Sequence, residues 1–138
     1  MSPADLDSHV DELCELHGIV RLSGSRGRAE VHRQNGRRAV AIRIPPIRGQ
    51  VTYFVALHEI GHLIGPGRSG TRLEKEAAAW RFALREARVA PTDASRRRIG
   101  RRLRSYVTWA ELRQHRRRPP VLPPRESPFW ALLAYLEA

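Results

Sequence analysis

The stretch from Val51 to Gly65 constrains this chain more than any other part of its sequence. It contains His58, Glu59 and His62 in the spacing H-E-x-x-H, and nearly every other residue in it is apolar or small. On a helix, the two histidines would lie one turn apart on the same face. Such an apolar helix is buried on most sides, and burying two imidazoles and a carboxylate without partners is unfavourable. A metal ion bound by the two histidines removes that penalty.

The spacing of the two histidines predicts a zinc site on this helix. Two neutral imidazoles one turn apart can bind Zn²⁺ from the same side, which makes His58 and His62 the expected metal ligands. Glu59 follows the first of them directly, so it can lie near the open coordination position. There it can take a proton from bound water and pass it to a leaving amine, as a general base does. The alternative interpretation is a buried helix in which the three residues occur together by chance.

The third metal ligand is expected on the following helix, predicted from about Thr71 to Val89. The apolar stripe of this helix consists of Leu73, Ala77, Trp80, Leu84 and Ala87. Glu74 is explained by the capping-box pattern T-R-L-E, and Glu86 lies near the helix end. Glu76 lies beside the stripe and therefore points toward the core. Two histidines and a glutamate form a known catalytic zinc set with one position left for water. The alternative for Glu76 is a buried salt bridge to an arginine.

These residues resemble a known family. The motif HEIGH and the downstream segment EAAAWRFAL, which begins at Glu76, resemble the ImmA/IrrE family of metallopeptidases. That family pairs H-E-x-x-H with a helix that reads E-x-x-A-x-x-F-A. The resemblance covers about residues 5–91 and places Glu76 on the family's glutamate ligand. The chain departs from the family at residues 89–91, which keep only the proline of a Leu-Met-Pro-like stretch.

The resemblance implies a fold and a function. The expected fold is α+β and zincin-like: an N-terminal helix, a small antiparallel sheet, the H-E-x-x-H helix and the glutamate-ligand helix, followed by C-terminal helices. The expected function is that of a zinc-dependent endopeptidase that hydrolyses a specific regulatory protein, such as a transcriptional repressor of a mobile element. Three residues could stabilise the oxyanion that forms during such hydrolysis, and the sequence does not choose among Tyr53, Tyr106 and His115.

The predicted N-terminal helix spans residues 4–17. Its apolar stripe is Leu6, Val10, Leu13 and Leu16. Cys14, the single cysteine, is expected in the core, and it excludes both an intramolecular disulfide and a cysteine-rich zinc site. His9 lies among acidic residues and is expected to be exposed.

Three strands are predicted before the motif helix. They cover residues 19–22, 29–33 and 37–44, where apolar and polar residues alternate. The dipeptide Asn35-Gly36 is typical of a tight hairpin turn. Val31 is expected to face the core and His32 the solvent. The last strand is expected to leave a free edge beside the active site, where an extended peptide could pair.

Arginine dominates the region after the glutamate-ligand helix. The net charge of the chain is +11, and residues 96–118 contain ten of its arginines but only one acidic residue. Residues 92–106 predict one helix, and the pattern T-W-A-E at residues 108–111 predicts the start of another. Such a pair could imitate a helix-turn-helix that binds DNA, or it could close the core with its arginines in solvent.

The arginines leave the function open between different classes of protein. The chain could be a DNA-binding regulator or partner-binding module whose metal site is only structural. It could also be a protease that is tethered to nucleic acid. Binding of duplex DNA that weakens steeply with salt is expected of both.

The length of 138 residues predicts a single domain. Its parts are a core at about 5–91, the arginine-rich helices at 92–118, an extended proline-rich linker at 119–126 and a final helix at 127–138. No apolar run approaches the length of about 18 residues that a membrane span needs. The acidic N-terminus lacks the pattern of a signal peptide, so a cytoplasmic location without membrane contact is expected.

Overall fold

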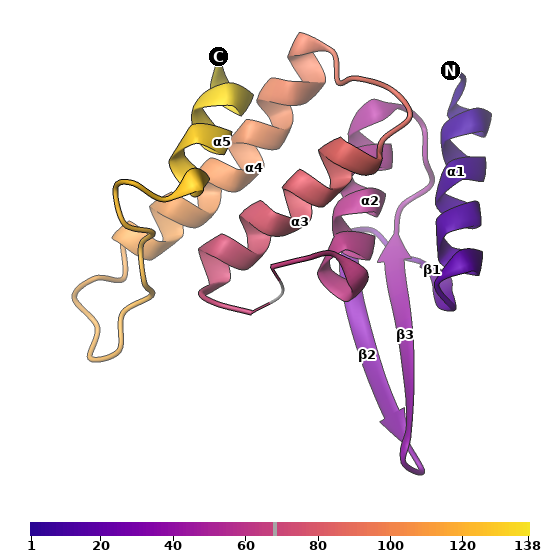
Figure 1. The fold of residues 1–138 in the computed structure, drawn as a ribbon, viewed down its shortest axis with the longest axis horizontal. Helices are drawn as coiled ribbons and strands as arrows, with labels where there is room; N and C mark the ends of the chain where they lie inside the picture. Colours follow the sequence, from indigo (N-terminus) through magenta and orange to yellow (C-terminus); the bar gives the residue numbers. More distant parts are fainter. Residues whose placement is uncertain (68) are drawn as a thin grey trace.

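Five helices and a three-stranded sheet make up the described part of the chain, which is residues 1–67 and 69–138 of a computed structural model. In chain order the elements are α1 (Pro3–Leu16), β1 (Ile19–Ser23), β2 (Arg28–Gln34), β3 (Arg37–Ile44), α2 (Gln50–Ile64), α3 (Arg72–Glu86), α4 (Asp93–Glu111) and α5 (Pro128–Glu137). The predicted α+β class is confirmed. Figure 1 shows the helices arranged around α2, while the β2–β3 hairpin extends away from them.

The helix α1 begins with a reciprocal cap between Ser2 and Asp5, and each side chain bonds the other residue's backbone N–H. Its buried side includes Leu6 and Cys14, as predicted. Two expectations for this helix are wrong. Leu16, the last helical residue, is 75% exposed, and His9 is 5% exposed because it lies one turn after Leu6 on the buried face.

The sheet is mixed and has the order β1-β3-β2. The predicted hairpin is confirmed: β2 and β3 pair antiparallel around the Asn35-Gly36 turn, in which both residues have positive φ angles. The expectation of a wholly antiparallel sheet is wrong, because β1 pairs parallel to β3, from Ile19 opposite Val40 onward. The chain therefore crosses from one side of β3 to the other between β1 and β2.

The central position of β3 changes two further expectations. Both of its edges are paired, so the edge strands of the sheet are β1 and β2 and not β3. Val31 is 47% exposed and does not face the core. The outer half of the hairpin extends beyond the helices, so no element covers it there (Figure 1). His32 is exposed, as predicted.

The helix α2 is buried at every residue from Tyr53 to Gly61, in agreement with its apolar sequence. It ends at Ile64, and Gly65, which precedes a proline, caps it. The helix α3 begins after Thr71, whose side chain accepts a hydrogen bond from the backbone N–H of Glu74. It ends at Glu86, slightly before the predicted end.

The region after α3 forms one long helix where the sequence predicted two. Thr108 lies inside α4, because the apolar stripe continues through Val107 and Ala110, and no glycine or proline follows Leu103 within the helix. The tight turn of a helix-turn-helix is therefore not formed within α4. The helix α5 begins after Ser127, as predicted, and packs on α4.

One contiguous core joins these elements, with buried side chains from all five helices and from β1 and β3. None of the described helices combines the length and the apolar character that crossing a lipid bilayer requires.

Candidate metal centre

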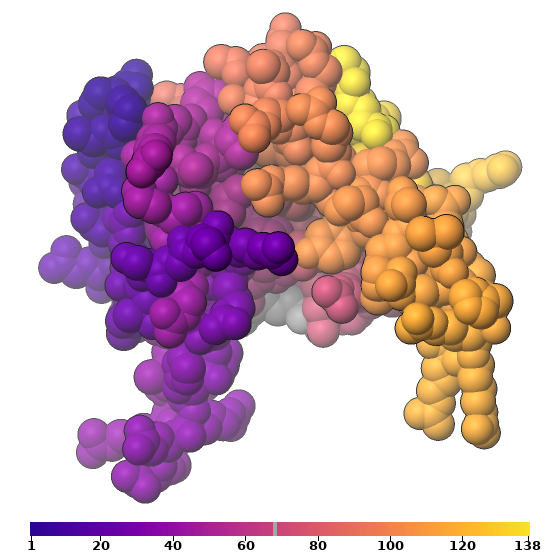
Figure 2. Space-filling model, turned by 180° about the vertical axis from the view of Figure 1, so that it is seen from behind, coloured from indigo at the N-terminus to yellow at the C-terminus, as the bar shows by residue number. Residues whose placement is uncertain are grey.

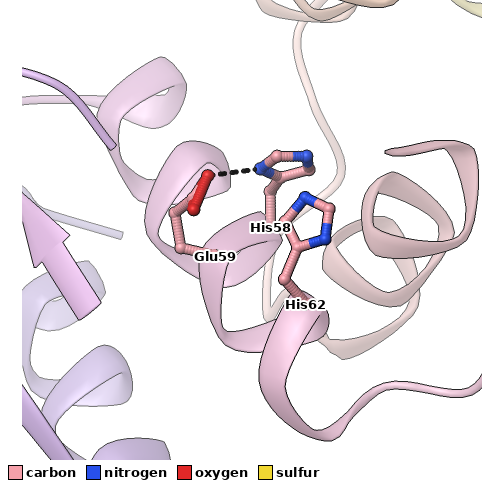
Figure 3. A group of neighbouring side chains, drawn as sticks. All are labelled: His58, Glu59 and His62. Atoms are coloured by element: carbon pink, nitrogen blue, oxygen red, sulfur yellow. Dashed lines mark hydrogen bonds and ion pairs between the residues drawn. The ribbon is translucent and has the colours of Figure 1, made fainter. Parts of the chain in front are cut away.

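Three polar side chains of the buried helix α2 lie close together (Figure 3). The rings of His58 and His62 lie on the same side of the helix, with their centroids 4.5 Å apart. His58, Glu59 and His62 each offer one ligand atom, and these atoms lie within 4.8 Å of one another. This largely buried group could hold a metal ion.

A second carboxylate approaches the two histidines from α3. One oxygen of Glu76 lies 2.7 Å from Nε2 of His58, and Nε2 of His62 lies 3.2 Å from both oxygens. Ligand atoms around a tetrahedral zinc ion are separated by about 3.3 Å, given bonds of about 2.0 Å. The inward direction predicted for Glu76 is confirmed, and among the described residues its ion pairs are with the histidines and not with an arginine.

The close packing of α2 and α3 brings Glu76 to the histidines. A Cβ atom on Gly61 would lie 2.9 Å from the Phe82 ring and 3.0 Å from the backbone oxygen of Ala79. Such distances are too short for any side chain at this position. The glycine inside HEIGH therefore allows the backbone of α3 to lie against α2 at the level of the two ligands.

The electrostatics of the cluster favour a cation between its carboxylates. Burial alone would raise the pKa of Glu76, but hydrogen bonds and charge from the two histidines outweigh it and hold that pKa at about 2. Burial alone would lower the pKa of His58, but hydrogen bonds to Glu59 and Glu76 outweigh it and raise that pKa. Without a metal ion, a proton on the imidazole stands in for that cation.

Glu59 lies on a different side of the imidazole from Glu76. Its carboxylate oxygen is 2.9 Å from Nδ1 of His58, whereas Glu76 contacts Nε2. The β1–β2 loop packs closely against Glu59. A Cβ atom added to Gly27 in this loop would lie only 3.3 Å from Cγ of Glu59. Glu59 thus orients the His58 ring by holding the nitrogen that faces away from Glu76.

A cleft of about 480 Å³ opens beside the cluster. Its walls come from five separate segments: the β1–β2 loop, the β3–α2 connection, α2, α3 and α4. The residues that matter here are Arg26, Gly27, His58, Glu59, Glu76, Trp80, Arg102 and Tyr106. Figure 2 shows this side of the molecule, where the dark purple segment near residue 25 extends towards the orange helix α4. His62 lines a smaller hollow of about 220 Å³ together with Gly61.

Trp80 is a site residue that the sequence did not single out, and Tyr106 was only one of three candidates for the oxyanion donor. The Trp80 ring stacks on His58, with centroids 4.0 Å apart and an interplanar angle of 26°. The sequence signal for Trp80 was its position on the apolar stripe of α3, one turn after Glu76. Tyr106 lies on α4, and only the packing of α4 against α3 brings it to the cleft.

The three oxyanion candidates differ in their surroundings. The hydroxyl of Tyr53 is held between Nδ1 of His9, at 2.6 Å, and the backbone N–H of Arg88, at 3.1 Å. His115 is exposed in the segment after α4. Tyr106 alone of the three lines the cleft, and burial, with the nearby charge of Glu76, raises the pKa of its hydroxyl to about 12.

Comparison of the chain with known proteins gives no match: no family model, no curated protein and no solved structure is similar to it.

Proposed function

We propose that this chain is a zinc-dependent endopeptidase in which His58, His62 and Glu76 hold the zinc ion. The observation that carries the proposal is the convergence of two imidazole Nε2 atoms on one buried, ionised carboxylate. Two histidines and a glutamate are a donor set of catalytic zinc sites, and such sites leave one position open. The adjoining cleft supplies the space for a substrate, and its volume is in the range of small-ligand sites.

The residues of the cleft divide the chemistry of peptide hydrolysis among them. When bound, zinc supplies Lewis-acid polarisation of the scissile carbonyl and lowers the pKa of water. Glu59, which lines the cleft, accepts a proton from the attacking water and returns it to the leaving amine. Tyr106 is protonated at neutral pH, as a tyrosine ordinarily is, and its pKa of about 12 strengthens that preference, so its hydroxyl donates to the carbonyl oxygen on which charge develops.

The same proposal extends to family and substrate. The pattern of HEIGH with EAAAWRFAL, together with the position of Glu76, supports membership of the ImmA/IrrE metallopeptidases and a zincin-like core. The proposed substrate is then a regulatory protein such as a transcriptional repressor, and both proteins would act in the cytoplasm.

Hydrolysis of a proteome-derived peptide library, read by mass spectrometry, tests this function. The zinc-loaded wild type is expected to cleave a limited set of sites, and Glu59→Gln to cleave them about 10²- to 10⁴-fold more slowly with unchanged zinc content. If Glu59→Gln cleaves the same sites at the wild-type rate, Glu59 is not the base. If the variant loses its zinc, Glu59 is a ligand and the assigned roles are wrong.

A further inference from the structure

A second, basic hollow lies beside the candidate active-site cleft. It has a volume of about 390 Å³ and lies between the start of α3 and the end of α4. We call it the arginine groove and define it by Arg72, Trp109, Arg113, Arg116 and Arg118, which line it. The groove therefore gathers four guanidinium groups around one aromatic ring.

These four arginines lack acidic partners within the part of the chain that the structure describes. Two of them lie over the Trp109 ring, at 4.8 Å for Arg72 and 5.2 Å for Arg113. The side chains of Arg116 and Arg118 are exposed. Several like charges held around one hollow repel one another, and an anionic ligand bound among them relieves that repulsion.

Arg72 connects the arginine groove with the cleft. The guanidinium of Arg72 lies 4.8 Å from the ring centroid of Trp109 in the groove and 5.6 Å from that of Tyr106 in the cleft. Farther along the cleft wall stand Arg26 and Arg102, and no described residue forms an ion pair with either of them. A basic path thus runs from the proposed catalytic residues into the groove.

We propose that the arginine groove binds an acidic segment of the polypeptide that the cleft hydrolyses. This inference rests on the proposed function. Arg102 and Trp109 lie about two helical turns apart on α4, which is a rise of about 10 Å. An extended peptide covers that distance in about three residues. The substrate class is therefore a polypeptide with a run of Asp or Glu residues close to the bond that is cleaved.

The local chemistry favours carboxylates of a peptide over a nucleic acid. The planar guanidinium pairs with a carboxylate through two parallel hydrogen bonds. Proteins that bind single-stranded nucleic acid use free aromatic faces on which bases stack. Trp109 already carries two guanidinium groups of this chain. The groove is also recessed, whereas readers of duplex DNA insert a projecting helix into the major groove.

Fluorescence anisotropy of a fluorescein-labelled octaglutamate peptide tests the proposal. The protein is the full chain with Glu59→Gln, so that binding is read without hydrolysis. The exposed pair Arg116 and Arg118 is changed to glutamine, and the matched control changes Arg37 and Arg38, exposed residues of the β2–β3 hairpin, in the same way. Both double variants lose two positive charges and keep the buried core intact.

The groove variant is expected to bind octaglutamate about tenfold more weakly, and the control variant to bind it as the parent does. The dependence of binding on salt should also become shallower in the groove variant alone. Equal weakening in both variants would mean that net charge attracts the peptide, which overturns the proposal. Tighter binding of a 20-nucleotide DNA strand, lost in the groove variant, would assign the groove to nucleic acid instead.

The outcome is independent of the proposed enzyme activity. Octaglutamate binding needs neither zinc nor hydrolysis, so a chain that binds the peptide in the groove but holds no zinc contradicts the peptidase and not the groove. A zinc-loaded, active chain whose binding does not depend on Arg116 and Arg118 contradicts the groove and not the peptidase.

Discussion

One buried and one half-buried tyrosine show how partners decide the role of a single residue. The hydroxyl of Tyr53 is hydrogen-bonded to His9 and to the backbone of Arg88, and it connects α1 and α2 with the end of α3. Tyr106 lies at the cleft wall near Glu76. The first hydroxyl therefore serves the fold, whereas the second, which interacts with Glu76, lies at the wall of the cleft beside the space for a substrate.

Replacing Tyr106 with phenylalanine should slow hydrolysis and leave zinc content and stability nearly unchanged. Loss of one oxyanion donor slows turnover by about 10²- to 10³-fold. Steady-state kinetics on a cleaved library peptide would measure kcat and KM. Tyr53→Phe is the control: it should lower the free energy of unfolding by about 1 kcal/mol and leave kcat unchanged. If Tyr53→Phe lowered kcat and Tyr106→Phe did not, Tyr106 would be excluded as the donor.

The buried His9 should make the stability of the fold depend on pH. Burial, together with the charge of Arg88, lowers the pKa of His9 in the folded state, so the unfolded chain binds its proton more readily. The stabilising contribution of neutral His9 is then fully present above the unfolded pKa, about 6.5. It is lost as the pH falls below that value toward the folded pKa.

Urea unfolding between pH 8 and pH 5 checks this dependence. The free energy of unfolding of the wild type should fall more steeply toward pH 5 than that of His9→Gln. His17→Gln changes an exposed histidine just after the same helix and should follow the wild type. Parallel curves for wild type and His9→Gln would show that His9 does not set this slope.

The proposed ligands and base, His58, Glu59, His62 and Glu76, could be recognised from the sequence because each lies on a helix whose period fixes the face of its side chain. The burial of His9 could have been predicted from the same helical period, because His9 lies one turn after Leu6. Its acidic neighbours suggested exposure instead. Trp80, Tyr106 and Arg102 could not be assigned to the cleft, because their places depend on contacts between elements.

At the scale of elements, the contact between α2 and α3 positions the candidate metal centre. Gly61 allows this contact, and Gly100 has the corresponding role between α4 and α5. A Cβ atom on Gly100 would lie 3.1 Å from the backbone of Leu136. Both glycines are inside helices, where alanine is otherwise the better residue. Their presence is therefore explained by close packing and not by helix propensity.

Gly61→Ala should separate α2 from α3 and weaken zinc binding. Overpacking of this kind destabilises a protein by about 1–3 kcal/mol. Because the ligand side chains would then be held less well in position, the Kd for zinc should rise about 10- to 100-fold. Gly100→Ala is the matched control, because it crowds a helix contact away from the metal centre.

Thermal unfolding and a zinc-chelator competition titration measure the two effects. Gly100→Ala should lower Tm but keep the Kd of the wild type. If both variants lose zinc affinity to the same degree, general destabilisation explains the loss and the helix contact has no specific role.

The elements themselves were largely predictable, and their connections less so. The Asn35-Gly36 turn predicted the hairpin correctly. The alternation of side chains does not reveal whether a neighbouring strand runs parallel or antiparallel, so the direction of β1 relative to β3 was predicted wrongly. The capping pattern at Thr108 was overridden, because the apolar stripe of α4 continues past it into the core. Local signals therefore failed where burial between elements was stronger.

At the scale of the whole molecule, the candidate active site depends on the complete fold. The walls of the cleft come from segments as far apart in the sequence as Arg26 and Tyr106. Between them, α2 supplies two proposed zinc ligands and α3 the third. Part of the positive charge of the chain follows one path from the cleft into the arginine groove. The arginines along this path have no acidic partners among the described residues.

The content of tightly bound zinc tests the central claim most directly. Wild type, Glu76→Ala and Glu74→Ala would be dialysed against metal-free buffer and measured by elemental analysis. The control residue Glu74 lies on the same helix but outside the cluster. We expect about one zinc ion per chain in wild type and Glu74→Ala, and a clear loss in Glu76→Ala. Zinc retained by Glu76→Ala, or no zinc in the wild type, would contradict the proposed centre.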